Sequence, residues 1–408
     1  YFIMTRSIPY YKNAQNQLDK VSLITRENLS GVRVIRAFSR QKEELKQFEQ
    51  SNSDLTRTQL LAGKISALLN PATYLILNLG VVVILWFGGI NVYTGTVTQG
   101  EVIALINYMS QILLALLALS NLIISITRAS ASAVRINEVF AIKSSMSDAN
   151  IDTRQVVCKA PKVEFRNVSF SYNLSEEEVL SNISFKAENR EIIGIIGGTG
   201  SGKSTLVNLI PRFYDVTDGK ILIDGIDVKD YPFTELRKKV AIVPQKAVLF
   251  RGTIRQNMKL GKKDATDDEI YKALEIAQAR EFVDAKPDRL DTVIMQGGKN
   301  LSGGQKQRLT IARALVAAPQ ILILDDSSSA LDYSTEARLR KAIMTQTRDM
   351  TVFIVSQRVS AIKHADKIIV LDNGRMVGIG KHEYLLESCE LYREICLSQL
   401  SENEVKRK

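Results

Sequence analysis

Two long stretches without a charged residue constrain the fold of this 408-residue chain most strongly. Residues 65–100 contain no Asp, Glu, Lys or Arg, and residues 102–127 contain none either, so that only Glu101 separates them. Residues 65–90 would form a helix of about 39 Å at about 1.5 Å per residue, enough to cross a hydrocarbon layer of roughly 30 Å with some tilt. The two stretches predict a transmembrane hairpin over residues 64–128 and exclude a purely soluble protein.

Basic residues flank this hairpin and predict its orientation. Arg57 and Lys64 precede it, and Arg128 and Arg135 follow it. Because cytoplasmic flanks of membrane helices are enriched in Lys and Arg, both ends should be cytoplasmic, with a turn at residues 91–100 and Glu101 facing outward. The expected location is therefore the cell membrane, with multiple spans and every soluble part in the cytoplasm.

The rest of the chain differs in texture on the two sides of the hairpin. Residues 1–63 are charged, carry apolar residues at helical spacing and are broken by Gly31, which predicts cytoplasmic helical extensions; a solvated helical hairpin without a special role remains the alternative. Residues 129–160 read as a helix end and linker. Residues 161–400 alternate strand and helix patterns, and 401–408 form a charged tail. The predicted fold class is an all-α transmembrane helical domain followed by an α/β P-loop ATPase domain.

Composition adds a few exclusions. A hydrophobic fraction of 45% argues against a disordered chain, and three cysteines in so long a chain argue against a disulfide-stapled secreted module. Solvated lysines account for most of the formal net charge of +10. The remaining positive charge can attract anionic lipid and nucleotide.

A phosphate-binding motif follows an apolar strand at residues 192–196. It has the pattern G-x-x-x-x-G-K-[ST] and is followed by an apolar helix, the context in which this motif binds nucleotide phosphates. Backbone N–H groups of the glycine-rich turn would surround the phosphates, with Lys203 reaching the β- and γ-phosphates and Ser204 binding Mg²⁺. The predicted contacts with ATP are Gly197, Gly198, Thr199, Gly200, Ser201, Gly202, Lys203, Ser204 and Thr205.

Two further elements complete the predicted site. A buried strand at residues 321–324 ends in Asp325, the position of a carboxylate that holds Mg²⁺ through water. Between the phosphate loop and Asp325 lies a second helix start that contains glycines, and such a helix N-terminus is a second possible anion-binding site, or nucleotide seat. Since one domain does not need two such seats for one triphosphate, two domains should meet head to tail. The residues of this signature segment are Leu301, Ser302, Gly303, Gly304 and Gln305.

The order of these motifs resembles the C-terminal part of an ATP-binding cassette (ABC) exporter half. The resemblance covers essentially the whole chain: residues 27–38 are similar to the family's second intracellular loop with its coupling helix, and the hairpin is similar to its fifth and sixth transmembrane helices. It implies that the first three spans and most of the fourth precede Tyr1. It also implies that Tyr172 stacks on adenine, that Gln245 contacts Mg²⁺ and the γ-phosphate, and that Asp332, in the segment 329–332, lies at a dimer seam.

The chain departs from the family at positions that serve hydrolysis. Asp326 stands where the family has a Glu that polarises the attacking water, and Gln357 stands where it has a switch histidine. Gln296 also replaces a Glu that contacts the intracellular loops. A shorter carboxylate and a side chain that cannot carry a proton predict slow turnover by the catalytic group of Asp326, Gln357 and Lys203. Drift or an engineered substitution is the alternative reading of each change taken alone.

Because the signature segment is intact, the chain resembles the degenerate-site member of a heterodimeric bacterial multidrug exporter. The expected partner is a second, non-identical half-transporter with Glu and His at the two positions. Membrane lipid and a small lipophilic substrate are expected as well, and no nucleic acid. The polar and aromatic side chains of the two predicted spans are neutral, which favours such a substrate, although they can equally be helix-packing contacts. They are Asn70, Tyr74, Asn78, Trp86, Asn107, Tyr108 and Gln111.

Two other functions remain open at this point, and a third is disfavoured by the hairpin. A poorly hydrolysing cassette can act as an ATP-gated regulator or channel subunit, and two identical chains can form a slow homodimeric exporter. A soluble ATPase of DNA repair or translation fits the positive charge but not the hairpin.

Overall fold

The computed structural model describes residues 2–142, 146–148, 160–172, 177–327, 331–347 and 349–399. Its contacts divide the chain into two compact units, Tyr1–Lys143 and Ser144–Lys408. The predicted tail, most of the predicted linker, and Ser329 and Ala330 lie outside the described residues.

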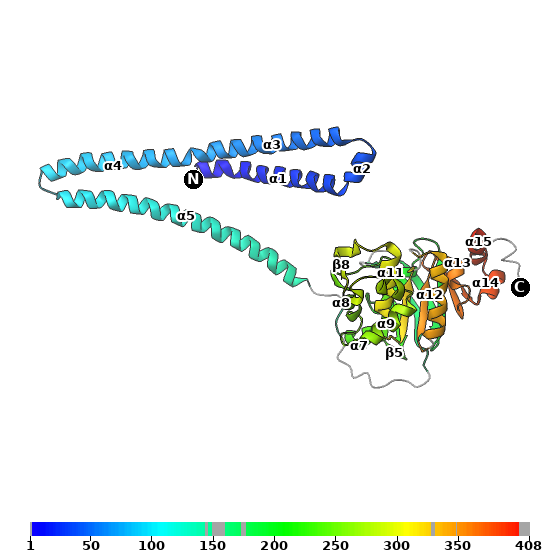
Figure 1. Cartoon of the computed structure of the whole chain (residues 1–408). Helices are drawn as coiled ribbons and strands as arrows, with labels where there is room; N and C mark the ends of the chain where they lie inside the picture. The colour runs from blue at the N-terminus through cyan, green and yellow to red at the C-terminus, as the bar shows by residue number, and fades with distance from the viewer. Residues whose placement is uncertain are drawn as a thin grey trace. The chain divides into compact units, whose positions relative to one another are not determined.

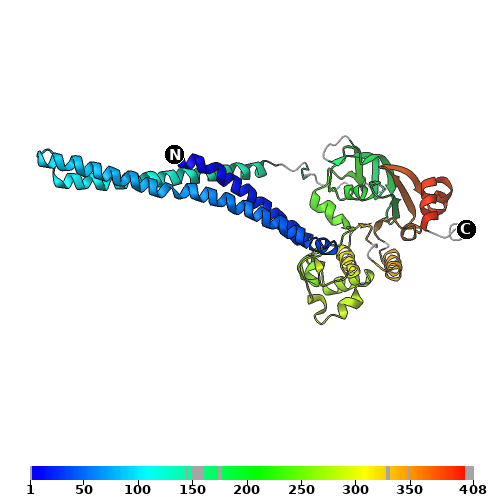
Figure 2. The ribbon, with the colours of Figure 1, turned by 90° about the horizontal axis from the view of Figure 1, so that it is seen from above.

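The first unit is made of helices, and α1 lies along α3 while α5 runs back beside α4 (Figures 1 and 2). Gly31 separates α1 from α2; a Cβ there would lie 3.0 Å from the carbonyl oxygen of Glu27. The helices are α1 (Phe2–Ser30), α2 (Val32–Ala37), α3 (Gln41–Ala67), α4 (Leu69–Tyr93) and α5 (Gln99–Ala141).

Two segments of the described helices are long and apolar enough to span a membrane, Gln41–Tyr93 and Gln99–Leu116. Their large apolar side chains are exposed within the chain, as Ile76 at 71% and Trp86 at 70% illustrate. So large an exposed apolar surface is unfavourable in water and favourable where lipid or further helices cover it.

The turn between the two apolar helices is shorter than the predicted 91–100. Helix α4 continues to Tyr93, and α5 begins at Gln99 because Thr98 caps it: the Thr98 hydroxyl accepts from Glu101 N at 3.4 Å, and Glu101 Oε2 accepts from Thr98 N at 2.7 Å. Such a reciprocal capping box fixes a helix start. The single charged residue between the apolar stretches is therefore a helix-capping residue, and α5 then runs unbroken through Arg128 to Ala141.

The second unit contains a six-stranded sheet whose strands are parallel except at β12. Strands β3 and β9 are apolar along almost their whole length, as expected for parallel strands covered on both faces. In spatial order the strands are β12 (Arg375–Gly380), β11 (Lys367–Asp372), β3 (Ile192–Gly197), β10 (Thr351–Val355), β9 (Ile321–Asp325) and β6 (Val240–Val243).

A four-stranded antiparallel sheet packs beside it through a shared apolar core. Its order is β2 (Leu180–Ala187), β1 (Val163–Phe170), β4 (Asp218–Ile223) and β5 (Ile226–Asp227). A two-stranded ribbon, β7 (Gly252–Thr253) with β8 (Val293–Ile294), accompanies a helical part in which α11 packs against α8 and α9. That part comprises α8 (Ile254–Lys259), α9 (Asp267–Ile276), α10 (Arg280–Asp284) and α11 (Gly303–Val316).

Of the other α-helices of this unit, α6 (Lys203–Leu209), α7 (Phe233–Lys239), α12 (Tyr333–Gln346) and α13 (Val359–Ile362) connect strands, and α14 (His382–Ser388) and α15 (Glu390–Gln399) follow the last strand, β12. The predicted fold class, a helical region followed by an α/β domain with the phosphate loop after a central strand, is confirmed.

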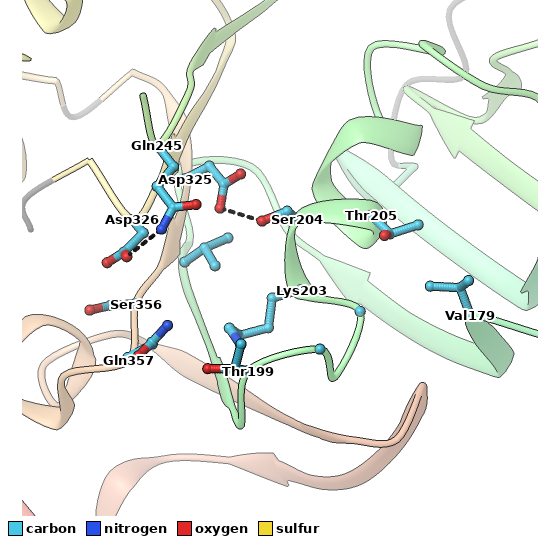
Figure 3. Close-up of a pocket in the computed structure, with 13 residues that line it drawn as sticks. Val179, Thr199, Lys203, Ser204, Thr205, Gln245, Asp325, Asp326, Ser356 and Gln357 are labelled. Carbon is cyan, nitrogen blue, oxygen red and sulfur yellow. Dashed lines mark hydrogen bonds between the residues drawn. The ribbon is translucent and has the colours of Figure 1, made fainter. Parts of the chain in front are cut away.

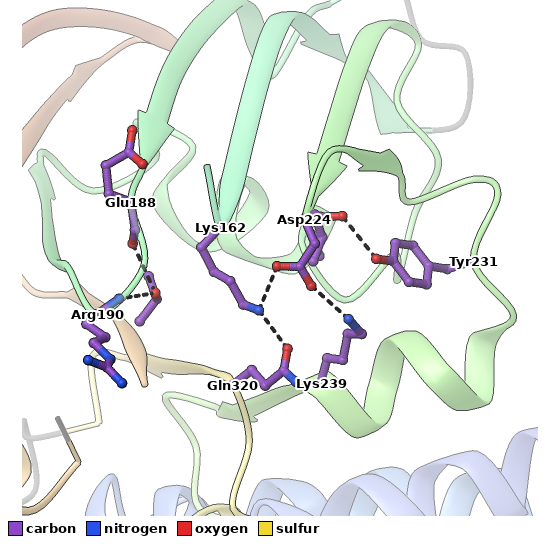
Figure 4. A network of polar contacts seen from close by, with 9 residues as sticks. Lys162, Glu188, Arg190, Asp224, Tyr231, Lys239 and Gln320 are labelled. Carbon is purple, nitrogen blue, oxygen red and sulfur yellow. Dashed lines mark hydrogen bonds and ion pairs between the residues drawn. The ribbon is translucent and has the colours of Figure 1, made fainter. Parts of the chain in front are cut away.

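A buried polar network joins the two sheets at the amino ends of the parallel strands (Figure 4). Lys162 Nζ donates to Asp224 Oδ1 at 2.7 Å and to Gln320 Oε1 at 2.6 Å, and Lys239 Nζ donates to Asp224 Oδ2 at 2.7 Å. Burial alone would raise the pKa of Asp224, but the hydrogen bonds from the two ammonium groups lower it below its ordinary value. Its stabilising contribution is therefore present above the ordinary carboxyl pKa and is lost as the pH falls.

Replacing Asp224 by Ala should destabilise the second unit by about 3 kcal/mol, because Lys162, only 7% exposed, would keep its charge without a carboxylate partner. For a unit of this size the midpoint of thermal unfolding should fall by roughly 6–12 °C, measured on the full-length chain. The matched control is Asp349→Ala, which removes the exposed ion pair with Arg190 nearby and should leave the midpoint almost unchanged. Equal effects of the two changes would contradict a structural role for the buried network.

Candidate nucleotide-binding site

The loop between β3 and α6 has a backbone that only glycine accommodates at two positions. Gly202 has φ of +91° and a Cβ there would lie 2.7 Å from Leu180 Cδ2; a Cβ at Gly197 would lie 2.1 Å from the carbonyl oxygen of Leu371. The chain therefore turns sharply from the central strand into the N-terminus of α6, where free N–H groups and the helix dipole favour an anion.

The Lys203 side chain is folded over this loop. Its Nζ donates to Gly197 O at 2.9 Å and to Gly198 O at 2.5 Å, and the residue is 8% exposed. Burial lowers the pKa of Lys203, while the charges of Asp325 and Asp326 oppose that shift. The ammonium group is thus held at the mouth of the loop, positioned for a phosphate.

A hydroxyl and a carboxylate meet beside it, in the arrangement that a hard cation needs. Ser204 Oγ donates to Asp325 Oδ1 at 3.0 Å, and Asp325 is 6% exposed. Burial raises the pKa of Asp325, and the neighbouring charge of Asp326 adds to this, against the hydrogen bond from Ser204. Oxygen ligands of this kind suit Mg²⁺, which takes one or two protein groups and completes its shell with phosphate and water. Accordingly, the described residues contain no cluster of three His, Cys, Asp or Glu side chains able to hold a metal alone.

Two of the three residues that depart from the family pattern, Asp326 and Gln357, face the same pocket (Figure 3), and Gln296 is not among its lining residues. Asp326 Oδ2 accepts from Gln245 Nε2 at 3.1 Å, and its backbone, at φ of +42°, is fixed by a hydrogen bond from its N–H to Val355 O at 2.9 Å. Gln357 follows β10 and is exposed toward this pocket. Three separate segments thus bring Gln245, Asp326 and Gln357 together.

The pocket has a volume of about 370 Å³, and its polar groups fit a magnesium–nucleotide complex: an ammonium group and helix N-terminus for phosphates, with Ser204 and Asp325 for the cation. Its lining also includes residues that the sequence did not indicate, Val179, Val355 and Ser356. Val179 directly precedes β2, Val355 ends β10 and Ser356 follows it, and no local motif marks them.

Tyr172 lies next to this pocket rather than in its lining. Its hydroxyl is 3.1 Å from Thr205 Oγ1, and its ring packs edge-on against Phe170 and Tyr214, with centroids 4.8 Å and 5.1 Å away. The aromatic group is thus tied to the phosphate loop, and stacking on adenine stays a prediction.

The signature segment and Asp332 begin helices outside this pocket. Ser302 Oγ accepts from Gln305 N at 3.3 Å and Gln305 Oε1 accepts from Ser302 N at 3.1 Å, a capping box at the start of α11. Asp332 caps α12 by accepting from Thr335 N at 2.9 Å, and the hydrogen bond from the Ser334 hydroxyl, together with that from Thr335 N, lowers the pKa of Asp332. None of these residues lines the pocket of its own chain.

This combination of a phosphate loop with a carboxylate-ended strand and apolar helices of membrane-spanning length is typical of a membrane protein driven by a nucleoside triphosphate. Residues 180–329 match the family model described as ABC transporter, and residues 1–116 match the model described as ABC transporter transmembrane region.

Relatives match over nearly the whole chain. An uncharacterised ABC transporter ATP-binding protein of Mycobacterium tuberculosis H37Rv is 39% identical over 402 residues, covering 98% of this chain and 69% of that protein. An ATP-dependent lipid A-core flippase of Desulfotalea psychrophila is 37% identical over 373 residues, covering 91% and 65%. The solved structure of a bacterial Atm1-family ABC exporter with ATP bound superposes with a TM-score of 0.83 at 29% identity, covering 98% of this chain and 70% of that one.

The chain therefore belongs to the ABC transporter family. It is a membrane protein and an exporter subunit whose ATPase domain couples ATP hydrolysis to translocation. The ABC ATPase domain implies that it binds ATP, and Mg²⁺ is general for such domains.

Proposed function

We propose that this chain is the degenerate-site half of a heterodimeric ABC exporter. One observation carries the proposal: Asp326 and Gln357, two of the three departures from the family pattern, line one pocket, and we assign both to the same hydrolytic step. The Asp326 carboxylate is one methylene shorter than Glu, and a displacement of about 1 Å from the required position can cost roughly 10²-fold in rate. A glutamine can hydrogen-bond a γ-phosphate but cannot carry a proton.

The proposal assigns distinct roles to the two nucleotide seats of this chain. Its own pocket binds ATP through the phosphate loop, residues 197–205, with Ser204, Asp325 and Gln245 at Mg²⁺ and Tyr172 at the adenine. Its signature segment, residues 301–305, and Asp332 complete the site of the partner, which carries Glu and His. The exposure of Ser302 and Gly303 supports this role. The capping box engages the N–H groups of Ser302 and Gln305. The N–H groups of Gly303 and Gly304 between them belong to the first turn of the helix, where they have no acceptor within the helix and can bind a phosphate from outside the chain.

The proposed substrate is a small lipophilic compound, including drug-like molecules. Support comes from the neutral character of the apolar helices, where Tyr74, Trp86 and Tyr108 are exposed, and from the relative named a lipid A-core flippase. On this proposal the protein spans the membrane several times and is divided into the five parts predicted from the sequence.

The test is the intact mass of the complex extracted from its native membrane in mild detergent. We expect this chain to be paired with a different polypeptide that has Glu and His at the positions of Asp326 and Gln357. A pure homodimer would overturn the heterodimer and leave a slow homodimeric exporter or an ATP-gated regulator as the function.

A further inference from the structure

The segment after β10, Ser356–Val359, is held by the last residue described in α15. Gln399 Nε2 donates to the carbonyl oxygen of Gln357 at 2.7 Å, and Gln399 Oε1 accepts from Val359 N at 2.9 Å. The carbonyl before an extended residue and the N–H after it lie on the same edge of the backbone. Arg358 is extended, with φ of −98° and ψ of 123°, so a single carboxamide pairs with both groups as a neighbouring strand would.

The other edge of Arg358 is held independently. Its N–H donates to Ser356 Oγ at 3.0 Å, and its Nη1 donates to Glu336 Oε2 at 3.0 Å, where Glu336 is only 5% exposed. The backbone at Arg358 is therefore fixed from both edges and through its side chain. Gln357, which lines the pocket, is the residue directly before Arg358.

Helix α15 provides a firm support for the Gln399 carboxamide. Tyr392 and Cys396 are fully buried in the same apolar cluster as Val359, and the Tyr392 hydroxyl lies 2.7 Å from His382 Nδ1. Gln399 itself is exposed, so it contributes little to that cluster by packing. What connects Gln399 to the rest of the fold is its two hydrogen bonds, to residues 40 and 42 positions away in the sequence.

We infer that Gln399 is a positioning residue for nucleotide recognition: through its two backbone hydrogen bonds it sets the placement of the Gln357 side chain against the terminal phosphate. The C-terminal helix thereby takes part in distinguishing ATP from ADP. This inference rests on the proposed contact between Gln357 and the γ-phosphate, and not on a slow rate of hydrolysis at this site. A plain helix cap, in which Gln399 only satisfies the first N–H of α13, is the competing explanation.

The test uses the full transporter and photolabelling of this chain with azido-ATP, competed by ATP or by ADP. Gln399→Leu removes both hydrogen bonds at similar size. It should raise the concentration of ATP needed for half-competition by about three- to tenfold, the range expected for one or two lost hydrogen bonds, and leave that of ADP unchanged. The control is Ser398→Ala on the same helix turn, whose hydroxyl donates only to Ile395 O at 2.8 Å and which should change neither value.

A double-mutant cycle with Gln357→Ala separates the possible outcomes. Gln357→Ala should weaken the binding of ATP but not that of ADP, and Gln399→Leu should cause no further weakening in that background. If Gln357→Ala weakens ATP binding while Gln399→Leu does not, the inference fails and the proposed function stands. The same holds if Gln399→Leu weakens the binding of ATP and of ADP equally. If Gln357→Ala leaves ATP unchanged, the contact with the γ-phosphate is wrong, and the inference fails with it.

Discussion

Replacing Asp326 by Glu and Gln357 by His together should raise ATP hydrolysis at this chain's own site by about 10²-fold, the factor associated with an approximately 1 Å displacement of a catalytic group. The Asp326 carboxylate accepts a hydrogen bond from Gln245 Nε2 at 3.1 Å, and the backbone N–H of Asp326 donates to Val355 O. A longer side chain from the same backbone would extend further into the pocket, and the introduced histidine would supply the proton-carrying group that glutamine lacks. The rate is measured by phosphate release with the partner's site inactivated.

The control for this gain is Asp326→Asn combined with Gln357→His, which keeps the size of residue 326 and removes its charge. It should show no gain, because activation of water needs the carboxylate. The left-handed backbone at residue 326, with φ of +42°, suits Asp better than Glu, so the thermal midpoint should be recorded for each variant. An unchanged rate in a stably folded Glu–His variant would place the defect elsewhere than at these two residues.

The sequence predicted those parts of the site whose chemistry lies in contiguous residues. The phosphate loop is one strand, one glycine-rich turn and one helix start, and Asp325 ends an apolar strand; in each case the local pattern alone indicates residues that lie at the pocket. The apolar helices were predictable for the same reason, since the absence of charge is itself the physical requirement for entering lipid.

What the sequence did not predict depends on contacts between distant segments. Ser356 lines the pocket, and Gln399 holds the backbone on either side of Arg358, but neither residue belongs to a recognisable motif. The start of α5 differs from the prediction for a different reason: the charge of Glu101 indicates a residue that faces outward, whereas its carboxylate completes a capping box with Thr98. A Thr followed three residues later by Glu is a local signal that could have placed this helix start.

Changing Ser302 to Ala should lower ATP turnover of the assembled transporter by about 10²-fold, although Ser302 lies outside the pocket of its own chain, since loss of one hydrogen-bond donor to a transition-state oxygen typically costs about 10²–10³. On the proposed function the Ser302 hydroxyl contacts the nucleotide held by the competent partner. The change therefore removes its donor from the site where turnover is fast. The measurement is substrate-stimulated ATPase activity of the complex in lipid.

Ser302 also caps α11, so a loss of activity could come from the helix rather than from the nucleotide. Thr266→Ala separates the two explanations, because Thr266 and Glu269 form the same reciprocal capping box at the start of α9, also with a 3.3 Å bond from the N–H to the hydroxyl. Loss of either cap should cost about 1 kcal/mol of stability. If turnover falls only in Ser302→Ala, the hydroxyl acts on nucleotide in the partner's site. If both variants lose activity alike, the signature segment matters through its fold, and the division of roles between the two seats loses its support.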